Sequence, residues 1–305
     1  MDTIDWLLDS DPAIGWQTMR DLTGAAPEVI ASERSRVTHQ GLGAAILACL
    51  GPDGAWHRNN AADWLPTLFT FQLLRATGID PTDPAVEAAA ARVSAGFRWH
   101  ESLGGKSFFE GETEPCINGG TLALGGYFGR PSHSLAQRLL SEQLEDGGWN
   151  CDAPKSNRSS YHSTICVLEG LLEYELAVRC AEQGVPGIAA SRAKAEEYLL
   201  QRGLFRRLST GEIADPEFLE FAYPPRYHYD VLRALDYFRA AGAQPDPRMN
   251  DAIQIVRRKQ QADGGWLLDR SYDESLALPL GESVGAPSAW NTLRALRVLR
   301  WYDGT

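Results

Sequence analysis

The segment QLEDGGW at residues 143–149 decides the fold of this chain, because the sequence repeats it. Residues 260–266, QQADGGW, keep the Gln six positions before the Trp, and residues 53–56, DGAW, keep the Asp-Gly-x-Trp core. Recurrence of one motif at wide spacing indicates repeated supersecondary units that pack on their neighbours. We therefore expect one domain over residues 1–305.

Two kinds of helical segment alternate around these copies. Segments of the first kind begin with Pro, Asp or Ser and are rich in Ala, Glu and Arg, as helices on an exterior are; they are residues 84–96, 132–144, 186–200 and 246–261. Segments of the second kind are apolar on most faces, which predicts buried helices. They are residues 12–24, 64–78, 116–129, 161–174, 226–242 and 288–302.

This alternation predicts an all-α fold with six inner helices at a spacing of ~50 residues. An open solenoid and a closed double ring both fit the pattern. The end segments are as apolar as the middle ones, so neither looks like the polar cap of a solenoid. We therefore favour an (α/α)6-like toroid, a double ring of inner and outer helices around a central cavity.

The Gln…Asp-Gly-Gly-Trp copies resemble the QW repeats of squalene-hopene cyclases and their relatives, a superfamily that includes the β-subunits of protein prenyltransferases. The resemblance covers nearly the whole chain. It implies that the Trp and Gln of each copy tie an outer helix to the next turn. The motif therefore bears on the fold more than on chemistry.

The charge of the chain argues against several partners. The formal net charge is −11, and no basic run interleaved with aromatics offsets it locally. Such a chain repels phosphate backbones, so we expect no nucleic-acid partner.

Residues 1–6, MDTIDW, lack the basic and apolar regions of a signal peptide, and no stretch approaches 18 uncharged apolar residues. We expect a cytoplasmic protein with no integral membrane segment.

The starts of the inner segments carry the residues best suited to chemistry, because the N-terminal ends of inner helices would converge on one rim of the cavity. Zinc prefers a tetrahedral set of thiolates and imidazoles. Cys116, Cys151, His162 and His228 would supply two of each. The alternative is that these side chains serve packing and hydrogen bonding alone.

The same rim resembles the zinc site of protein prenyltransferase β-subunits. Glu114-Pro115-Cys116 is similar to the Asp-Gly-Cys of that family, and Tyr161-His162-Ser163 is similar to its Tyr-His-Thr. Here Glu replaces Asp, and Cys151 is a further candidate outside the family pattern. The resemblance implies a zinc cofactor held near these positions.

Further residues at this rim are candidates for catalysis or binding. Asp230 is a candidate general base or a partner that orients an imidazole; it could equally be a carboxylate favoured by a helix dipole. Glu114 and Tyr161 are the other catalytic candidates. Residues that could bind an apolar substrate or stabilise a cation are Trp64, Tyr227, Tyr229, Trp290 and Arg226. An anionic headgroup would need basic residues, for which Arg226, Arg233, Lys155 and Arg158 are available.

These observations favour a zinc-dependent, prenyltransferase-like enzyme that acts on an isoprenoid-like, thiol or hydroxyl substrate in the cavity. The acidic Asp-x-Asp-Asp motif of squalene-hopene-type cyclases does not occur. Two alternatives are a metal-free terpene cyclase or isomerase that uses Asp230 or Glu114 as its acid, and a non-catalytic protein that carries a hydrophobic ligand. The partner in each case is a small hydrophobic or isoprenoid-like molecule.

The remaining cysteines and histidines are expected to have no chemical role. Cys49, Cys166 and Cys180 lie at helix ends or on apolar faces, which predicts burial. The other histidines fall in outer or loop segments, which predicts exposure; they are His39, His57, His100 and His133.

Overall fold

The computed structural model describes residues 2–58, 64–179 and 184–304, and these residues form helices and loops with isolated β-bridges but no β-strand. The predicted all-α fold is confirmed. The helices are α1 (Thr3–Leu8), α2 (Pro12–Leu22), α3 (Pro27–Ser35), α4 (Gly41–Ala48), α5 (Trp64–Ala76), α6 (Pro84–Gly96), α7 (Pro115–Tyr127), α8 (His133–Ser141), α9 (Tyr161–Val178), α10 (Ile188–Leu200), α11 (Val231–Ala240), α12 (Asn250–Arg258) and α13 (Ala289–Asp303).

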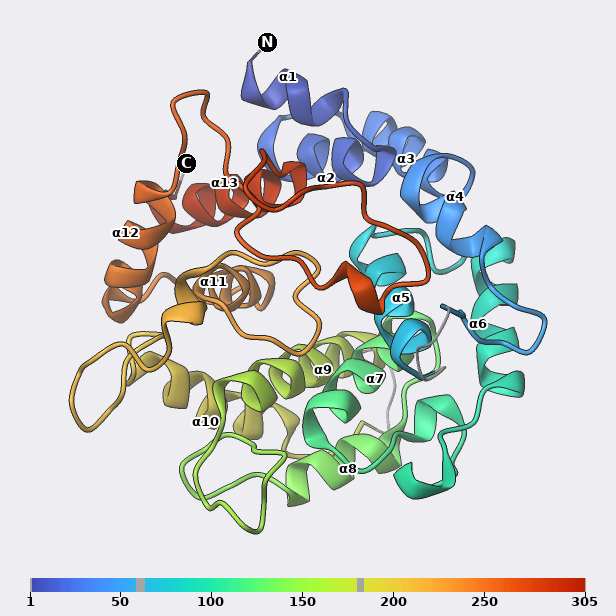
Figure 1. The fold of residues 1–305 in the computed structure, drawn as a ribbon, viewed down its shortest axis with the longest axis vertical. Coiled ribbons are helices and arrows are strands. Elements are labelled where there is room, and N and C mark those ends of the chain that lie inside the picture. Colours follow the sequence, from blue (N-terminus) through green and yellow to red (C-terminus); the bar gives the residue numbers. More distant parts are fainter. Residues whose placement is uncertain (1, 59–63, 180–183, 305) are drawn as a thin grey trace.

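The predicted inner segments correspond to α2, α5, α7, α9, α11 and α13, and the predicted outer segments to α6, α8, α10 and α12. Among the inner helices, α5 packs on α7, α7 on α9, α11 on α13, and α13 on α2. Figure 1 shows α6, α8, α10 and α12 at the edge of the molecule. The buried apolar side chains join into one core cluster.

Each Asp-Gly-x-Trp copy makes the same two hydrogen bonds. The indole Nε1–H donates to a carbonyl of the preceding helix, α4, α8 or α12, in the pairs Trp56–Ile46 (2.8 Å), Trp149–Leu139 (2.7 Å) and Trp266–Val256 (2.8 Å). The backbone N–H of the same Trp donates to a threonine hydroxyl of the following inner helix, in the pairs Trp56–Thr67 (3.0 Å), Trp149–Thr164 (3.1 Å) and Trp266–Thr292 (2.9 Å). The motif thus joins an outer helix to the next inner helix.

The Gln of the repeat also has a structural role. The side-chain amide of Gln143 donates to the carbonyl oxygens of Gly147 (2.6 Å) and Ser191 (2.8 Å), which links the turn to α10. Gln260 makes the corresponding bond to Gly264 (3.0 Å). These bonds hold the turn that follows each outer helix and, for Gln143, attach that turn to α10.

Helices α7 and α9 approach each other closely because glycines face each other between them. A Cβ atom at Gly119 would lie 2.4 Å from the carbonyl oxygen of Cys166, and one at Gly170 would lie 2.4 Å from that of Gly119. Gly126 meets the backbone of Glu173 in the same way. The absence of side chains at these three positions sets the distance between the two helices.

The inner segment predicted from residue 226 begins later than expected, at Val231. Pro224 and Pro225 precede it, and Arg226 has a φ of +50°, a left-handed conformation that interrupts a helix. Asp230 is the N-cap residue, since its carboxylate accepts a hydrogen bond from the backbone N–H of Arg233 at 2.8 Å. Residues 226–229 therefore lie in a loop and not on an inner helix.

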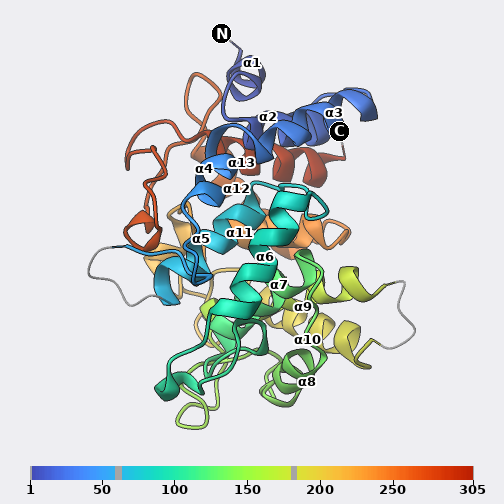
Figure 2. The ribbon, with the colours of Figure 1, turned by 90° about the vertical axis from the view of Figure 1, so that its right-hand side faces the viewer.

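Figure 2 shows the segment between α12 and α13 on one side of the molecule, and α3 with the C-terminus on the other.

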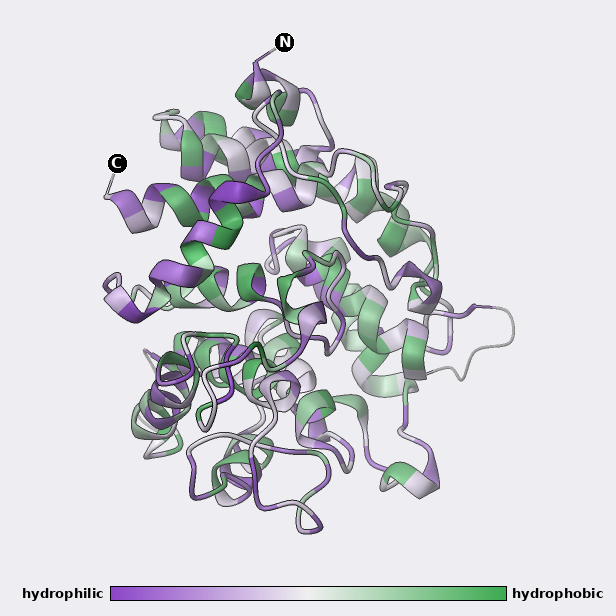
Figure 3. Cartoon of the chain, turned by 60° about the vertical axis from the view of Figure 1, so that its left-hand side comes forward, coloured by the Kyte–Doolittle hydropathy of each residue, from purple (hydrophilic) through white to green (hydrophobic). Residues whose placement is uncertain are grey.

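No described helix is long and apolar enough to span a bilayer. Figure 3 accordingly shows hydrophilic and hydrophobic residues on the same helices.

Candidate functional site

A cavity of about 720 Å³ lies among the inner helices. All six contribute to its lining, together with α3 and the loop residues Tyr223–Arg226. From α5, α7, α9 and α11 the lining residues come mainly from the second half of each helix, whereas those of α13 come mainly from its first half. The rim on which the candidate metal ligands were predicted is therefore not the main wall of this cavity.

Arginines dominate the charge of the cavity. The positively charged lining residues are Arg20, Arg34, Arg75, Arg226, Arg233, Arg239, Arg294 and Arg297. The negatively charged ones are Asp80, Glu169, Glu173 and Asp236. This excess of cations lies in a chain whose formal net charge is −11. A positive cavity in an acidic protein concentrates small anions.

One wall of the cavity is an ion-pair network between α11 and α13. The carboxylate of Asp236 accepts hydrogen bonds from Arg297 and Arg239, and Arg297 also donates to Gln17 on α2 at 3.1 Å. Burial opposes the ionisation of Asp236, but the charges of Arg297 and Arg239 outweigh it and hold its pKa below the usual range. Among the described residues, the carboxylate nearest to Arg294 is that of Asp236, with one oxygen 4.0 Å from the Arg294 Nε.

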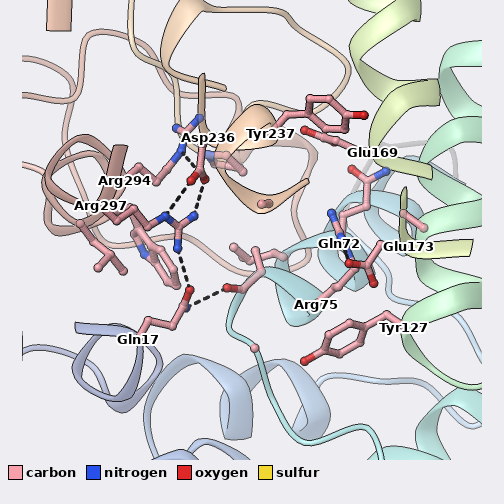
Figure 4. A pocket seen from close by; sticks show the side chains of 18 of the residues that line it. Gln17, Gln72, Arg75, Tyr127, Glu169, Glu173, Asp236, Tyr237, Arg294 and Arg297 are labelled. Carbon is pink, nitrogen blue, oxygen red and sulfur yellow. Dashed lines mark hydrogen bonds and ion pairs between the residues drawn. The ribbon is translucent and has the colours of Figure 1, made fainter. Parts of the chain in front are cut away.

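The facing wall carries carboxylates of α9 (Figure 4). Glu169 binds Arg233 through two hydrogen bonds, of 2.8 and 2.7 Å, which link α9 to α11. Burial opposes the ionisation of Glu169, but Arg233 outweighs it and lowers its pKa. Glu173 lies 3.4 Å from Arg75 on α5. Two charged walls thus face each other across the cavity.

Three hydrogen-bond donors on residues that line the cavity lack a protein partner. Among the described residues, the hydroxyl of Tyr223 and the Nε–H groups of Arg75 and Arg226 are buried without a hydrogen bond. The ring of Tyr223 stacks on Trp290, with centroids 4.6 Å apart and planes 11° apart. Burial raises the pKa of Tyr223, so its hydroxyl keeps its proton and can donate it.

A second group of polar side chains lies at the N-terminal end of α7. The sulfurs of Cys116 and Cys151 are 3.0 Å apart, and the Cys116 sulfur is 3.7 Å from a carboxylate oxygen of Glu114. These three ligand atoms lie within 4.8 Å of one another, a geometry that could hold a metal ion. The hydrogen bond between the thiols lowers the pKa of Cys151 and, together with burial, raises that of Cys116.

The two predicted histidine ligands lie together but outside this group. His162 Nδ1 accepts a hydrogen bond from the backbone N–H of Tyr229 at 2.9 Å, and the His162 and His228 rings are 5.7 Å apart. His228 is stacked between Tyr227 (4.3 Å) and Tyr272 (3.9 Å). In the described part of the chain, Glu114, Cys116 and Cys151 form the one compact group of potential ligands, so the four-residue set is not brought together.

Burial is also the main cause of the low basicity of these histidines. It lowers the pKa of His162, and it lowers that of His228 to about 3, with further contributions from His162 and Arg226. Both imidazoles are therefore neutral near pH 7.

Of the predicted substrate-binding residues, Trp290 and Arg226 line the cavity, whereas Trp64, Tyr227 and Tyr229 are outside its lining. Trp64 packs on Trp99 with ring centroids 6.3 Å apart, and the Tyr229 hydroxyl donates to the carbonyl of Leu204. Arg226 forms an ion pair with Glu274 (2.9 Å) outside the lining.

The predicted catalytic residues also lie apart from the cavity lining. Asp230 caps α11, and burial raises its pKa. The Tyr161 hydroxyl donates to the carbonyl of Arg206 at 2.6 Å. Glu114 is exposed beside Cys116. Of the proposed basic residues, Arg233 lines the cavity, while Lys155 and Arg158 are exposed in the loop before α9.

Sequence reasoning missed Arg75, Arg294, Arg297 and Asp236 as cavity residues. A signal was available, because charged residues within segments that otherwise predict burial must be paired or face a cavity. Arg294 and Arg297, for example, lie three residues apart in the predicted inner segment 288–302.

The remaining predictions have mixed outcomes. Cys166 is buried, as predicted. Cys49 was also predicted to be buried, but it is exposed, at the C-cap position of α4. Cys180 lies outside the described residues. The predicted exposure is confirmed for His39, His57, His100 and His133.

No protein-family model matches the chain, and the comparison with curated proteins found no match. The chemistry of the cavity and of the Glu114 group therefore rests on their own residues.

Proposed function

We propose that the six inner helices close into an α/α toroid and that its central cavity binds a small anionic molecule with an apolar part, on which the protein acts as an enzyme. The contribution of every inner helix to one cavity supports closure of the ring. The observation that carries the proposed ligand class is the excess of arginines over carboxylates in that lining.

The aromatic lining supports the apolar part of the proposed ligand. Trp16, Phe69, Tyr223 and Trp290 line the cavity beside the arginines. Aromatic faces bind apolar surface and also stabilise cationic groups. An isoprenoid-like molecule with an anionic headgroup has both features that the lining would recognise, and transferases and isomerases act on such molecules.

Calorimetric titration with geranyl diphosphate, geraniol and sodium pyrophosphate tests this function. We expect geranyl diphosphate to bind most tightly, since it engages both the arginines and the aromatic side chains of the lining. Arg75→Gln should weaken its binding, while Arg248→Gln, at an exposed arginine paired with Asp246 and Glu197, should not. Equal affinity for geraniol and geranyl diphosphate would contradict the proposed ligand class. Recovery of bound geranyl diphosphate unchanged after a day, by mass spectrometry, would favour a carrier over an enzyme.

We further propose that Glu114, Cys116 and Cys151 hold a zinc ion. Two thiolates and a carboxylate are ligands that zinc accepts, and three protein ligands leave one position of a tetrahedron for water or substrate. Two Zn–S bonds of about 2.3 Å at a tetrahedral angle place the sulfurs ~3.8 Å apart. The thiols, at 3.0 Å, would therefore separate by somewhat less than 1 Å on binding.

Metal analysis of protein purified without a histidine tag tests the zinc proposal. We expect about one equivalent of zinc per chain, lost in Cys116→Ser and Cys151→Ser. His162→Gln is the matched control, since His162 lies outside the group and bonds to Tyr229, and it should retain the metal. Zinc far below one equivalent in the unmodified protein, even after incubation with zinc sulfate, would exclude the site.

A further inference from the structure

The sulfurs of Cys116 and Cys151 lie 3.0 Å apart, although the two residues are 35 positions apart in the chain. Cys116 is the second residue of α7, and Cys151 lies in the turn that follows Trp149. Both are free thiols. The sulfurs of a disulfide are about 2.05 Å apart, so a movement of about 1 Å would bring these two thiols to bonding distance.

The packing of α7, α9 and the repeat turn holds this pair in place. The glycines between α7 and α9 let the two helices approach closely, and Figure 1 shows them side by side. The repeat turn is fixed to α9, because the N–H of Trp149 donates to the hydroxyl of Thr164 at 3.1 Å. The N–H of Cys151 donates to the hydroxyl oxygen of Ser163 at 3.3 Å, and that oxygen lies 3.2 Å from the Cys151 sulfur.

The two thiols differ in their access to solvent. Cys116 is 7% exposed, whereas Cys151 is partly exposed. Cysteines that react with small oxidants are partly exposed and often lie next to a second thiol that resolves the product. Cys166 has other partners, since its sulfur contacts the guanidinium of Arg233 and the carbonyl of Tyr227, each at 3.6 Å. Cys151 is therefore suited to meet the oxidant, and Cys116 to resolve the product.

We propose that Cys116 and Cys151 form a reversible disulfide when the protein meets a peroxide, and that this disulfide expels the zinc ion proposed above. The thiolate is the form of cysteine that binds zinc, so the disulfide leaves Glu114 as the one remaining ligand of the group. Formation of the disulfide does not require the metal, whereas the release of zinc rests on the proposed zinc site.

The observed separation of the sulfurs lies between the values of the two states. It is 3.0 Å here, against ~3.8 Å expected with zinc bound and ~2.05 Å in a disulfide. Each state is therefore within about 1 Å of the observed positions. The same two sulfurs form either the zinc site or the disulfide, so the two states exclude each other.

The oxidation balances with hydrogen peroxide as the oxidant. The thiolate of Cys151 attacks one peroxide oxygen, the O–O bond breaks, hydroxide leaves, and Cys151 becomes a sulfenic acid. The sulfur of Cys116 then attacks the sulfur of Cys151, the S–O bond breaks, and the departing hydroxide takes the proton of the Cys116 thiol. The two thiols together lose two electrons and two protons, and the peroxide becomes two molecules of water. A small dithiol reverses the oxidation by thiol–disulfide exchange.

Peroxide treatment of the full chain, both metal-free and loaded with zinc, tests this inference. We expect the metal-free protein to lose about two of its five thiols and to regain them with dithiothreitol. Trypsin separates the two cysteines, because it leaves Cys116 in residues 107–138 and Cys151 in residues 139–155, each as the only cysteine of its peptide. Mass spectrometry should find these two peptides joined. The zinc-loaded protein should release its metal to a chromogenic chelator as the thiols disappear.

Three variants sharpen the experiment. Cys49→Ser is the matched control, because Cys49 is an exposed thiol at the end of α4, and it should form the disulfide as the unmodified protein does. Cys116→Ser should stop at the sulfenic acid of Cys151, which dimedone traps. Cys151→Ser should lose the buried Cys116 thiol more slowly than the unmodified protein does. Because the joined peptides are sought in the unmodified protein, the test does not depend on the folding of any variant.

The outcomes separate this inference from the proposed zinc site. Peptides that stay unlinked after peroxide treatment would overturn the disulfide, and so would a link between two different chains. A linked pair in a chain that binds no zinc would support the disulfide and overturn the zinc site. About one equivalent of zinc without a linked pair after peroxide treatment would overturn the disulfide alone. Zinc that stays bound while the disulfide forms would overturn the proposed release.

Discussion

The carboxylate of Asp236 on α11 accepts hydrogen bonds from Nε and Nη2 of Arg297 on α13, so one two-point ion pair joins two inner helices at the wall of the cavity. The side chain of Asp236 is 15% exposed and that of Arg297 is 13% exposed. Arg239 donates to the same carboxylate. Asp236 therefore binds two arginines of this wall at once, and Asp21 lies 3.6 Å from Arg297 as well.

We expect Asp236→Asn to lower the free energy of unfolding by about 3 to 5 kcal/mol, since it removes the two-point counter-charge of Arg297 and leaves that buried guanidinium only the longer contact with Asp21, at 3.6 Å. The pKa of Asp236 is lowered in the folded state. Its stabilisation is therefore fully present above the unfolded value near 3.8 and is lost as the pH falls further. Urea unfolding at pH 7 and at pH 3 should show a smaller difference between variant and unmodified protein at the lower pH. A difference under ~1 kcal/mol at pH 7 would show that the pair contributes little.

The threonine that accepts from each repeat Trp gives a second prediction. In Thr164→Val the buried N–H of Trp149 loses its acceptor, which should cost about 1 to 3 kcal/mol of stability. The control is Thr121→Val on α7, since the Thr121 hydroxyl is buried without a partner among the described residues. It should be neutral or stabilising in the same denaturant titration. Equal losses in the two variants would mean that the shape change, and not the hydrogen bond, sets the cost.

The close approach of α7 and α9 gives a third prediction. A Cβ at Gly170 would meet the backbone of Gly119, so Gly170→Ala should lower stability by about 1 to 3 kcal/mol despite the higher helix propensity of Ala. Gly24→Ala meets no atom within 4 Å and should leave the melting temperature unchanged or slightly raised. A Gly170→Ala protein as stable as the unmodified one would show that the two helices can separate at little cost.

His228 predicts a dependence of stability on pH. Its pKa is about 3 in the folded protein because the ring is buried and lies near His162, Arg226 and Arg233. The unfolded chain binds a proton near pH 6.5. Stability from this group is therefore complete above pH 6.5 and declines as the pH falls toward 3. The unfolding free energy of His228→Gln should fall less between pH 7 and pH 5 than that of the unmodified protein. Parallel curves would assign the pH dependence to other groups.

The helices and their alternation could be predicted because each depends on local pattern. Buried segments such as residues 64–78 and 116–129 carry apolar residues on most faces, and the structure places α5 and α7 there. The start of α11 could not be placed in this way. Aromatic residues continue through 227–229, and only the backbone at Pro224–Arg226 and the cap at Asp230 set the start of the helix at Val231.

The candidate metal ligands could likewise be predicted only in part. The sequence predicts Cys116, Cys151, His162 and His228 as one ligand set from their places near the starts of inner segments, and the structure brings the two cysteines together. The histidines lie elsewhere, because His162 bonds to Tyr229 and His228 stacks between tyrosines. Ligand type can be read from a sequence, whereas the direction of a side chain depends on its packing neighbours.

The sequence by itself determined that this protein is all-α, with a repeated Asp-Gly-x-Trp turn between outer and inner helices, because helical periodicity and turn residues act over a few positions. Only the tertiary structure decided which charges meet. Arg75, Tyr223, Arg226, Asp236 and Arg297 are separated by up to 222 residues, and each charge acquires its pairing only from the packing of α5, α11, α13 and the loop before α11. Electrostatic interaction depends on distance in space and on burial, and neither is set by local sequence.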